Sequence, residues 1–190
     1  MRELDMKRFL HCFFAAILCI GTAGLGWAQA ANAVQTDGQA HMQDRLSREV
    51  RHELVMLPEL SIFDNLEYKV TGSKVTLLGQ VRNAVLKDSA EKVVKKIEGV
   101  ESVDNQIEIL PASPMDDKIR LQVARALFND DRLSRYSMGS LPPIHIIVKG
   151  GHITLEGVVD SQADKDYATL KANGVPGTFS VNNNLRVQKS

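Results

Sequence analysis

Apolar and polar residues alternate in two stretches of the chain, and in each stretch the alternation continues on both sides of a glycine-containing turn. The apolar residues of the first stretch share one face of a predicted hairpin and are Leu66, Tyr68, Val70, Val75, Leu77 and Val81. The turn is Gly72-Ser73, a two-residue connection that suits a tight β-hairpin. The resulting register places Val70 opposite Val75 and Tyr68 opposite Leu77.

A second hairpin of the same kind follows 78 positions later, with Gly150-Gly151 at its turn. Its inward residues are Ile144, Ile146, Val148, Ile153, Leu155 and Val159. The same offset relates Asn105 to Asn183 in the last predicted strands. An offset that holds over this length indicates two copies of one small fold.

Apolar residues at helical spacing precede and follow the first hairpin. The leading face consists of Leu46, Val50, Leu54 and Leu57, in a helix that we expect Asp44 to begin and Pro58 to end. Residues 84–98 form a second predicted helix, with Gly99 as the C′ glycine behind it. The inward residues of that helix are Ala90, Val93, Val94 and Ile97. An alternating strand then runs through Val103, Ile107 and Ile109.

The sequence therefore predicts an α+β fold of two repeated α-β-β-α-β modules, each a three-stranded sheet with two helices on one face. We place the first module at residues 44–110, a stiff linker at residues 111–115 and the second module at residues 116–189. The second module begins with the helical face Ile119, Val123, Ala126 and Leu127 and has a further helix at about residues 162–172. It also contains an insertion within residues 129–143.

The first 30 residues have the order of a secretory signal. Lys7 and Arg8 supply a positive start, residues 9–20 are mainly apolar, and Ala28-Gln29-Ala30 is a small-x-small cleavage site. Cleavage after Ala30 leaves residues 31–43, which lack periodicity and which we expect to be a flexible leader. The alternative is an uncleaved anchor, although the apolar run is short for a membrane span.

Charge and cysteine content narrow the functional classes. The chain has 23 basic and 23 acidic residues, and residues 1–30 hold three of the basic and two of the acidic ones, so the exported part has a net charge of −1. This balance gives no electrostatic signature of nucleic-acid binding, and no nucleic-acid partner is expected. Cys12 and Cys19 both lie in the signal segment, so the exported part is expected to fold without disulfides.

Three motifs of the first module together resemble the BON domain, named after bacterial osmotically inducible periplasmic proteins and nodulation proteins. They are Val75-Thr76-Leu77-x-Gly79-x-Val81, a helix ending in Ile97-Glu98-Gly99-Val100, and Val103-x-Asn105-x-Ile107. The second module repeats the pattern in Ile153-Thr154-Leu155-Glu156-Gly157-Val158-Val159 and in residues 181–185. The resemblance implies a periplasmic envelope protein of Gram-negative type. It also implies attachment to phospholipid surfaces, support of envelope integrity, or a role in secretion and channel assemblies.

The first helix of the second module carries the candidate binding surface. On a helical wheel that starts at Ile119, the side chains of Leu121 and Phe128 lie about 180–200° from the core face. Arginines flank this stripe, and an apolar stripe edged by arginines suits an anionic phospholipid surface. The candidate lipid- or partner-binding residues are Arg120, Leu121, Arg125, Phe128, Arg132 and Arg135. In the alternative interpretation, the first module or the 129–143 loop covers Leu121 and Phe128.

The outer faces of the two sheets form a second candidate surface. Leu78, Ile147 and Val158 lie opposite the core side of their strands and would be exposed in isolated modules. They are either scattered surface residues or part of a contact between modules or chains. Asn105 and Asn183 occupy the same strand position in both copies, which indicates a shared structural role.

No catalytic residue, metal site or cofactor is expected. His41, His52, His145 and His152 lack the spacing of a zinc site and are expected at the surface. Asp116-Asp117 suits the positive end of a helix dipole. No nucleophile motif or phosphate-binding loop is present in the sequence.

We therefore expect a non-enzymatic, exported envelope protein that attaches to anionic phospholipid, mainly through its second module. A scaffold that docks envelope or secretion proteins is the first alternative. A sensor of a small ion or solute is the second alternative, without a supporting motif.

Overall fold

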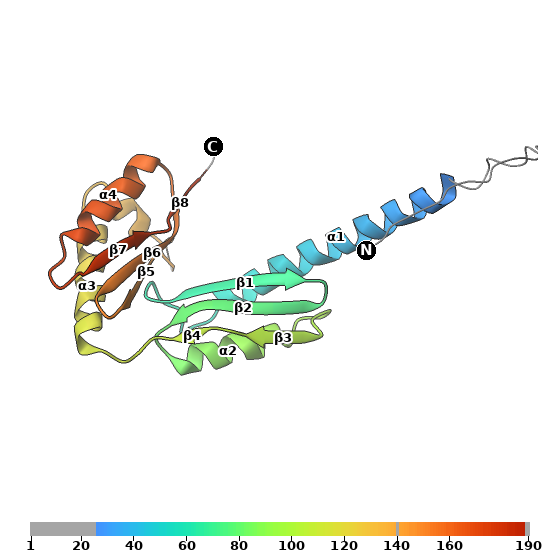
Figure 1. Ribbon diagram of the computed structural model, residues 1–190, viewed down its shortest axis with the longest axis horizontal. Helices are drawn as coiled ribbons and strands as arrows, with labels where there is room; N and C mark the ends of the chain where they lie inside the picture. Colours follow the sequence, from blue (N-terminus) through green and yellow to red (C-terminus); the bar gives the residue numbers. More distant parts are fainter. Residues whose placement is uncertain (1–25, 140, 189–190) are drawn as a thin grey trace, which may run out of the picture. The chain divides into compact units, whose positions relative to one another are not determined.

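The computed structural model describes residues 26–139 and 141–188, so the predicted signal segment lies largely outside the described residues. The described residues from Gln39 onward form one compact unit, which contains both sheets and the helices packed on them. The elements of the first module are α1 (Gly26–Val55), β1 (Asn65–Thr71), β2 (Lys74–Val81), α2 (Ala84–Val94), β3 (Ser102–Asn105) and β4 (Glu108–Ile109). Those of the second module are α3 (Pro114–Phe128), the short 3-10 helix η1 (Ser134–Ser137), β5 (Ile144–Lys149), β6 (His152–Val159), α4 (Gln162–Asn173), β7 (Ser180–Asn183) and β8 (Arg186–Val187) (Figure 1).

The predicted fold class and element order are confirmed in both modules. In the first, β1 and β2 pair antiparallel in the expected register, with Val70 opposite Val75 and Tyr68 opposite Leu77. The last strand pairs parallel to β2 on its other side. That strand is divided into β3 and β4, and the second module divides its last strand into β7 and β8 in the same way.

The division of the last strand follows from the repeated asparagine. Asn105 accepts a hydrogen bond on its side-chain oxygen from the Ile107 amide at 3.2 Å, and this local turn interrupts the ladder. Its Nδ2 donates to the Lys87 carbonyl on α2 at 3.1 Å. Asn183 makes the equivalent bonds, to the Leu185 amide at 3.0 Å and the Lys165 carbonyl at 2.7 Å. The asparagine therefore joins the last strand to the second helix of each module.

The glycine of each central strand is required by close backbone packing. Gly79 has a φ of 109°, and a Cβ atom there would overlap the carbonyl oxygen of Asn65 on the neighbouring strand. Gly157 has a φ of 119°, and its Cβ would overlap the carbonyl oxygen of Pro143. Only glycine, which lacks a Cβ atom, can adopt this positive φ and lie so close to the neighbouring backbone.

Two hydrophobic cores lie between the helices and one face of each sheet. The buried residues of the first core are Val50, Leu54, Leu57, Val75, Leu77, Val81, Leu86, Ala90, Val94 and Ile107. Those of the second are Ile119, Val123, Leu127, Leu133, Tyr136, Ile144, Ile146, Val148, Ile153, Leu155, Val159, Ala168, Ala172, Val175 and Leu185. All six inward residues predicted for the second hairpin belong to the second core, whereas Leu66, Tyr68 and Val70 of the first hairpin are only partly buried against the first core.

The helix boundaries of the first module differ from the prediction. Helix α1 begins at Gly26 and contains residues 31–43, where the sequence predicted a flexible leader and a helix start at Asp44. Residues 31–43 contain no proline and several alanines, so their local propensity permits a helix even without an apolar face. Helix α2 ends at Val94, before the predicted end, and turns lead to Gly99, whose φ is 92°.

The insertion of the second module contributes to its core. Leu133 is fully buried and Tyr136 is 5% exposed, and both belong to the second core cluster. The sequence pattern did not indicate these contacts because the segment has no regular period.

The two modules contact each other through the segment before β1. The Ile146 amide of edge strand β5 donates to the Ile62 carbonyl at 2.7 Å, and His145 Nδ1 bonds the Asp64 carbonyl at 2.6 Å. Phe63 packs against the second core. Ile147, which the alternation placed on an exposed outer face, is only 4% exposed, in keeping with the alternative that the modules pack together.

Candidate functional site

Helix α3, which carries most of the predicted site, has strong local reasons to begin where it does. Ser113 is its N-cap and accepts from the Asp116 amide at 3.2 Å, and Pro114 occupies the first turn. Asp116 is buried and its carboxylate accepts from the Gly150 and Gly151 amides at 2.8 and 2.9 Å. These bonds fix α3 to the turn between β5 and β6. The sequence indicated only that Asp116 suits the positive end of the helix dipole, and not this contact with the turn.

Arg120, predicted to contact lipid phosphates, does not lie on the surface. It is 2% exposed, and its Nη1 pairs with Asp117 at 2.6 Å while its Nη2 donates to the Val148 carbonyl at 2.5 Å. The wheel placed Arg120 at the edge of the core face, and its long side chain follows the core side to the end of β5. This part of the prediction is therefore corrected: Arg120 stabilises the module and is not available to a partner.

The two apolar residues of the predicted stripe have different surroundings. Leu121 is 50% exposed. Phe128 is half-buried and packs against the second core. The stripe is thus interrupted, and only its N-terminal part is open to solvent.

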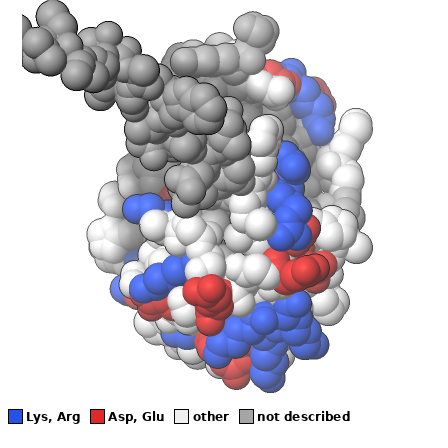
Figure 2. All heavy atoms as spheres, turned by 90° about the vertical axis from the view of Figure 1, so that its right-hand side faces the viewer, with Lys and Arg blue, Asp and Glu red and all other residues white. Residues whose placement is uncertain are grey.

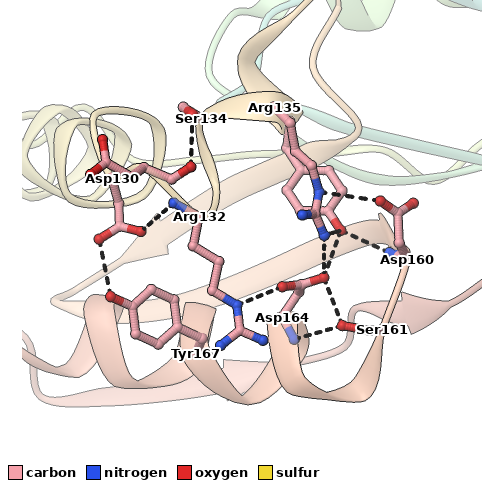
Figure 3. Close-up of polar contacts among 10 residues, drawn as sticks. Asp130, Arg132, Ser134, Arg135, Asp160, Ser161, Asp164 and Tyr167 are labelled. Atoms are coloured by element: carbon pink, nitrogen blue, oxygen red, sulfur yellow. Dashed lines mark hydrogen bonds and ion pairs between the residues drawn. The ribbon is translucent and has the colours of Figure 1, made fainter.

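Arg132 and Arg135 converge on one buried carboxylate at the start of α4 (Figure 3). Arg132 Nε donates to Asp164 Oδ1 at 2.8 Å, and Arg135 Nη2 donates to Asp164 Oδ2 at 2.5 Å. Ser161, the N-cap of α4, and Tyr136 also donate to Asp164, at 2.7 and 3.1 Å. Both arginines therefore hold the insertion against α4.

This network determines the protonation of Asp164. Burial by itself would raise the pKa of Asp164, but the hydrogen bonds from Ser161, Arg132 and Tyr136 outweigh it and lower the pKa to about 2. Asp164 is therefore ionised at neutral pH and pairs with both arginines, and Asp160 pairs with Arg135 as well, at 3.3 Å. Although the side chains of Arg132 and Arg135 are 42% and 48% exposed, neither arginine is a free cation.

A second set of contacts joins the start of the insertion to α4. Asp130 accepts from Tyr167 at 3.1 Å and pairs with Lys171 at 2.7 Å. The Arg132 guanidinium and the Lys171 ammonium both lie over the Tyr167 ring, at 5.1 and 5.2 Å from its centre. Figure 3 shows Asp130 and Tyr167 next to the Arg132 side chain.

In the second module, α3 and α4 together form a surface that is exposed to solvent. Leu170 of α4 is 66% exposed, and a shallow depression of about 420 Å³ lies between the helices. Arg125 lines this depression and makes no ion pair among residues 26–139 and 141–188. We call this the α3–α4 surface; Gln122, Arg125, Leu170 and Pro176 line the depression, and the exposed Leu121 lies one helical turn before Arg125 on α3. The sequence analysis did not identify Leu170, although a leucine on the otherwise polar side of α4 could have indicated an exposed apolar residue.

Phe179, in the loop before β7, is a second exposed apolar residue that the sequence reading missed. It is 80% exposed, stands beside the His152 ring at 5.8 Å and fills the space next to Gly151. The equivalent residue of the first module is Glu101, so a comparison of the two copies could have identified it.

The corresponding surface of the first module is a depression of about 580 Å³ next to α1, and charged residues dominate its lining: Arg48, Glu49, Glu53 and Lys96. The charged residues of this module include the pair Glu91–Lys95 on α2, at 2.5 Å. On the face shown in Figure 2, Lys and Arg side chains lie next to Asp and Glu side chains, so charges of both signs are mixed there. This mixture is what a solvated face presents.

Two further properties concern only the part of the chain that the structure describes. None of its helices combines the length and apolar character needed to cross a bilayer. No group of three or more His, Cys, Asp or Glu side chains within it is arranged to hold a metal ion.

Comparison with known proteins gives a consistent family. The BON domain matches residues 43–111 and again residues 115–189. The chain is 26% identical to osmotically-inducible protein Y of Escherichia coli, over 91% of this chain and 94% of that protein. It is also 26% identical to the outer membrane lipoprotein DolP of Haemophilus influenzae, over 91% of this chain and 89% of that protein.

Among solved structures, the chain is similar to CdsD, a structural protein of the type III secretion system of Chlamydia trachomatis. The identity is 12%, the match covers 77% of this chain and 93% of that chain, and the TM-score is 0.32. A similarity of this size supports no conclusion about function.

Proposed function

Because the chain belongs to the BON domain family and carries two copies of the domain, we propose that it is a non-enzymatic protein of the bacterial envelope that attaches to anionic phospholipid surfaces. The contact is the α3–α4 surface of the second module. The observation that carries this proposal is the exposure of Leu121 and Leu170 on the same helical layer as Arg125.

The chemistry of this surface suits the interface between lipid headgroups and acyl chains. Apolar side chains that enter this zone lose contact with water, and half-exposed leucines contribute about 1 kcal/mol each. A cation such as Arg125 near an anionic leaflet adds about 1 kcal/mol. The sum is small, so the attachment is peripheral and reversible.

One relative's name supports an envelope location, and the other's supports a role in osmotic stress. One is named an osmotically-inducible protein and the other an outer membrane lipoprotein. Together with the predicted signal segment 1–30 and cleavage after Ala30, their names support a periplasmic protein with a role in envelope integrity or stress tolerance. The scaffold function is the alternative, in which the same surface meets a protein.

Liposome flotation of residues 31–190 tests the proposal. We expect binding to vesicles that contain phosphatidylglycerol, weakening as salt rises, and no binding to pure phosphatidylcholine vesicles. Substituting both leucines, L121S with L170S, should abolish flotation, and R125E should reduce it. The matched control is V85S, which removes an apolar side chain that is 53% exposed on α2 of the first module. Flotation that survives the leucine substitutions overturns the assignment to this surface, and no flotation in any condition favours the scaffold.

A further inference from the structure

Strand β1 is an edge strand of the first sheet, since β2 is its only partner among the described strands. Across the two-residue turn, Thr71 stands opposite Lys74, so Thr71, Lys69 and Glu67 direct their backbone groups toward β2. Leu66, Tyr68 and Val70 direct theirs to the open side. The Val70 carbonyl on that side accepts from Gln43 at 2.7 Å, whereas the Tyr68 amide has no backbone partner among residues 26–139 and 141–188.

The second module shows the equivalent edge covered at one point by a turn, residues 61–64, which precedes β1. Ile146 of the second module is equivalent to Tyr68, and its amide donates to the Ile62 carbonyl of this turn at 2.7 Å. The His145 side chain bonds the Asp64 carbonyl and holds the turn against β5. Thus the same edge position is covered by chain in one module and open in the other.

A groove of about 970 Å³ runs along the open edge. Its walls include Leu66 and Tyr68 of β1, Val55 of α1, the loop residue Leu141, and Val158 on the outer face of β6. His145 lines the groove and also makes the contact between the modules, so the groove continues that interface. This volume is at the upper end of ordinary ligand sites and accommodates an extended peptide.

We propose that this groove binds an extended peptide segment of a partner polypeptide, which adds to β1 as an antiparallel strand. Main-chain hydrogen bonds to Leu66 and Tyr68 supply the affinity, and alternate apolar side chains of the peptide contact the groove walls. Glu67 and Lys69 are exposed on the other face of the strand. They select a peptide that has a basic residue opposite Glu67 and an acidic residue opposite Lys69. This site is separate from the α3–α4 surface and does not depend on lipid binding.

The test uses two labelled heptapeptides and fluorescence anisotropy with residues 31–190. The matching peptide is Thr-Val-Glu-Val-Lys-Val-Thr, which in antiparallel register places its Glu opposite Lys69 and its Lys opposite Glu67. The mismatched peptide exchanges the Glu and the Lys. We expect the matching peptide to bind at least about threefold more tightly, because two cross-strand pairs change from attraction to repulsion. A proline in place of the central valine should prevent binding, since the peptide then lacks the amide that pairs with Tyr68.

The charge-exchanged protein E67K/K69E should reverse this preference, and the control K92E/E98K, with one residue on α2 and one in the turn after it, should keep it. All four residues are exposed, so both variants should unfold at the same denaturant concentration as the wild type. Failure of both peptides to bind at about 1 mM overturns the proposal. A preference that E67K/K69E leaves unchanged overturns the location. If sedimentation shows a dimer that K69E disrupts and E67K/K69E restores, a second copy of this chain pairs with β1. The proposal of a partner polypeptide is then wrong.

Discussion

Gly157 of β6 lies against the carbonyl oxygen of Pro143 so closely that no side chain fits between them. The G157A variant has two costs: the backbone must keep a φ of 119°, and the methyl group meets a backbone atom that cannot move aside. We expect a loss of more than about 3 kcal/mol in the free energy of unfolding, measured by urea denaturation. The control is G150A, which has a φ of 59° and open space around its Cβ, and should cost about 1 kcal/mol. Equal losses in the two variants would contradict the steric explanation.

Asp164 should make the stability of the second module depend on pH in the acid range. Its pKa is lowered to about 2 in the folded protein, so its stabilising effect is complete above the unfolded pKa and disappears as pH falls toward 2. The D164N variant should therefore be less stable by about 2 kcal/mol at pH 7, and the difference from wild type should shrink between about pH 4 and pH 2. Chemical denaturation at several pH values measures this. A difference that stays constant with pH would mean that shape, and not charge, explains the loss.

Asp116 should stabilise the turn between β5 and β6. Its buried carboxylate accepts two backbone amides, from Gly150 and Gly151, and hydrogen bonds to a charged group are among the stronger ones. D116A should lower the free energy of unfolding by about 2–3 kcal/mol and speed amide hydrogen exchange at Gly150 and Gly151. D131A, at an exposed position of the insertion, serves as the control and should change neither quantity.

His145 should weaken the contact between the modules when it becomes protonated. Burial lowers the pKa of His145, although the Asp64 and Ser61 carbonyls and the Glu156 carboxylate act in the opposite direction. With a folded pKa below the unfolded one, stability is complete above about pH 6.5 and declines as pH falls through the folded pKa. H145N keeps a donor toward the Asp64 carbonyl and does not titrate, so its stability should stay level between about pH 7 and pH 5. A decline as steep as in wild type would assign the pH dependence to other groups.

Much of the fold could be predicted from the sequence because its signals are local and occur twice. The alternation around Gly72 and Gly150 determined both hairpins and their registers, and the 78-residue offset gave the order of elements. The repetition of Asn105 and Asn183 indicated a structural role, which the hydrogen bonds to α2 and α4 confirm.

The surface was harder to predict because it depends on contacts between distant segments. A helical wheel gives the direction of a Cβ atom, but the guanidinium of Arg120 extends several atoms further and reaches the Val148 carbonyl. Arg132 and Arg135 looked like free cations because their partner, Asp164, is far away in the sequence. The burial of Ile147 accompanies contacts made by the segment before β1, which no property of β5 itself reveals.

The hydrogen bond between Ile62 and Ile146 has a consequence for producing the later module on its own. A free strand edge pairs readily with other chains, and on β5 the preceding module occupies one of the open backbone amides. We therefore expect a fragment that encodes only the later module to aggregate more readily than the pair.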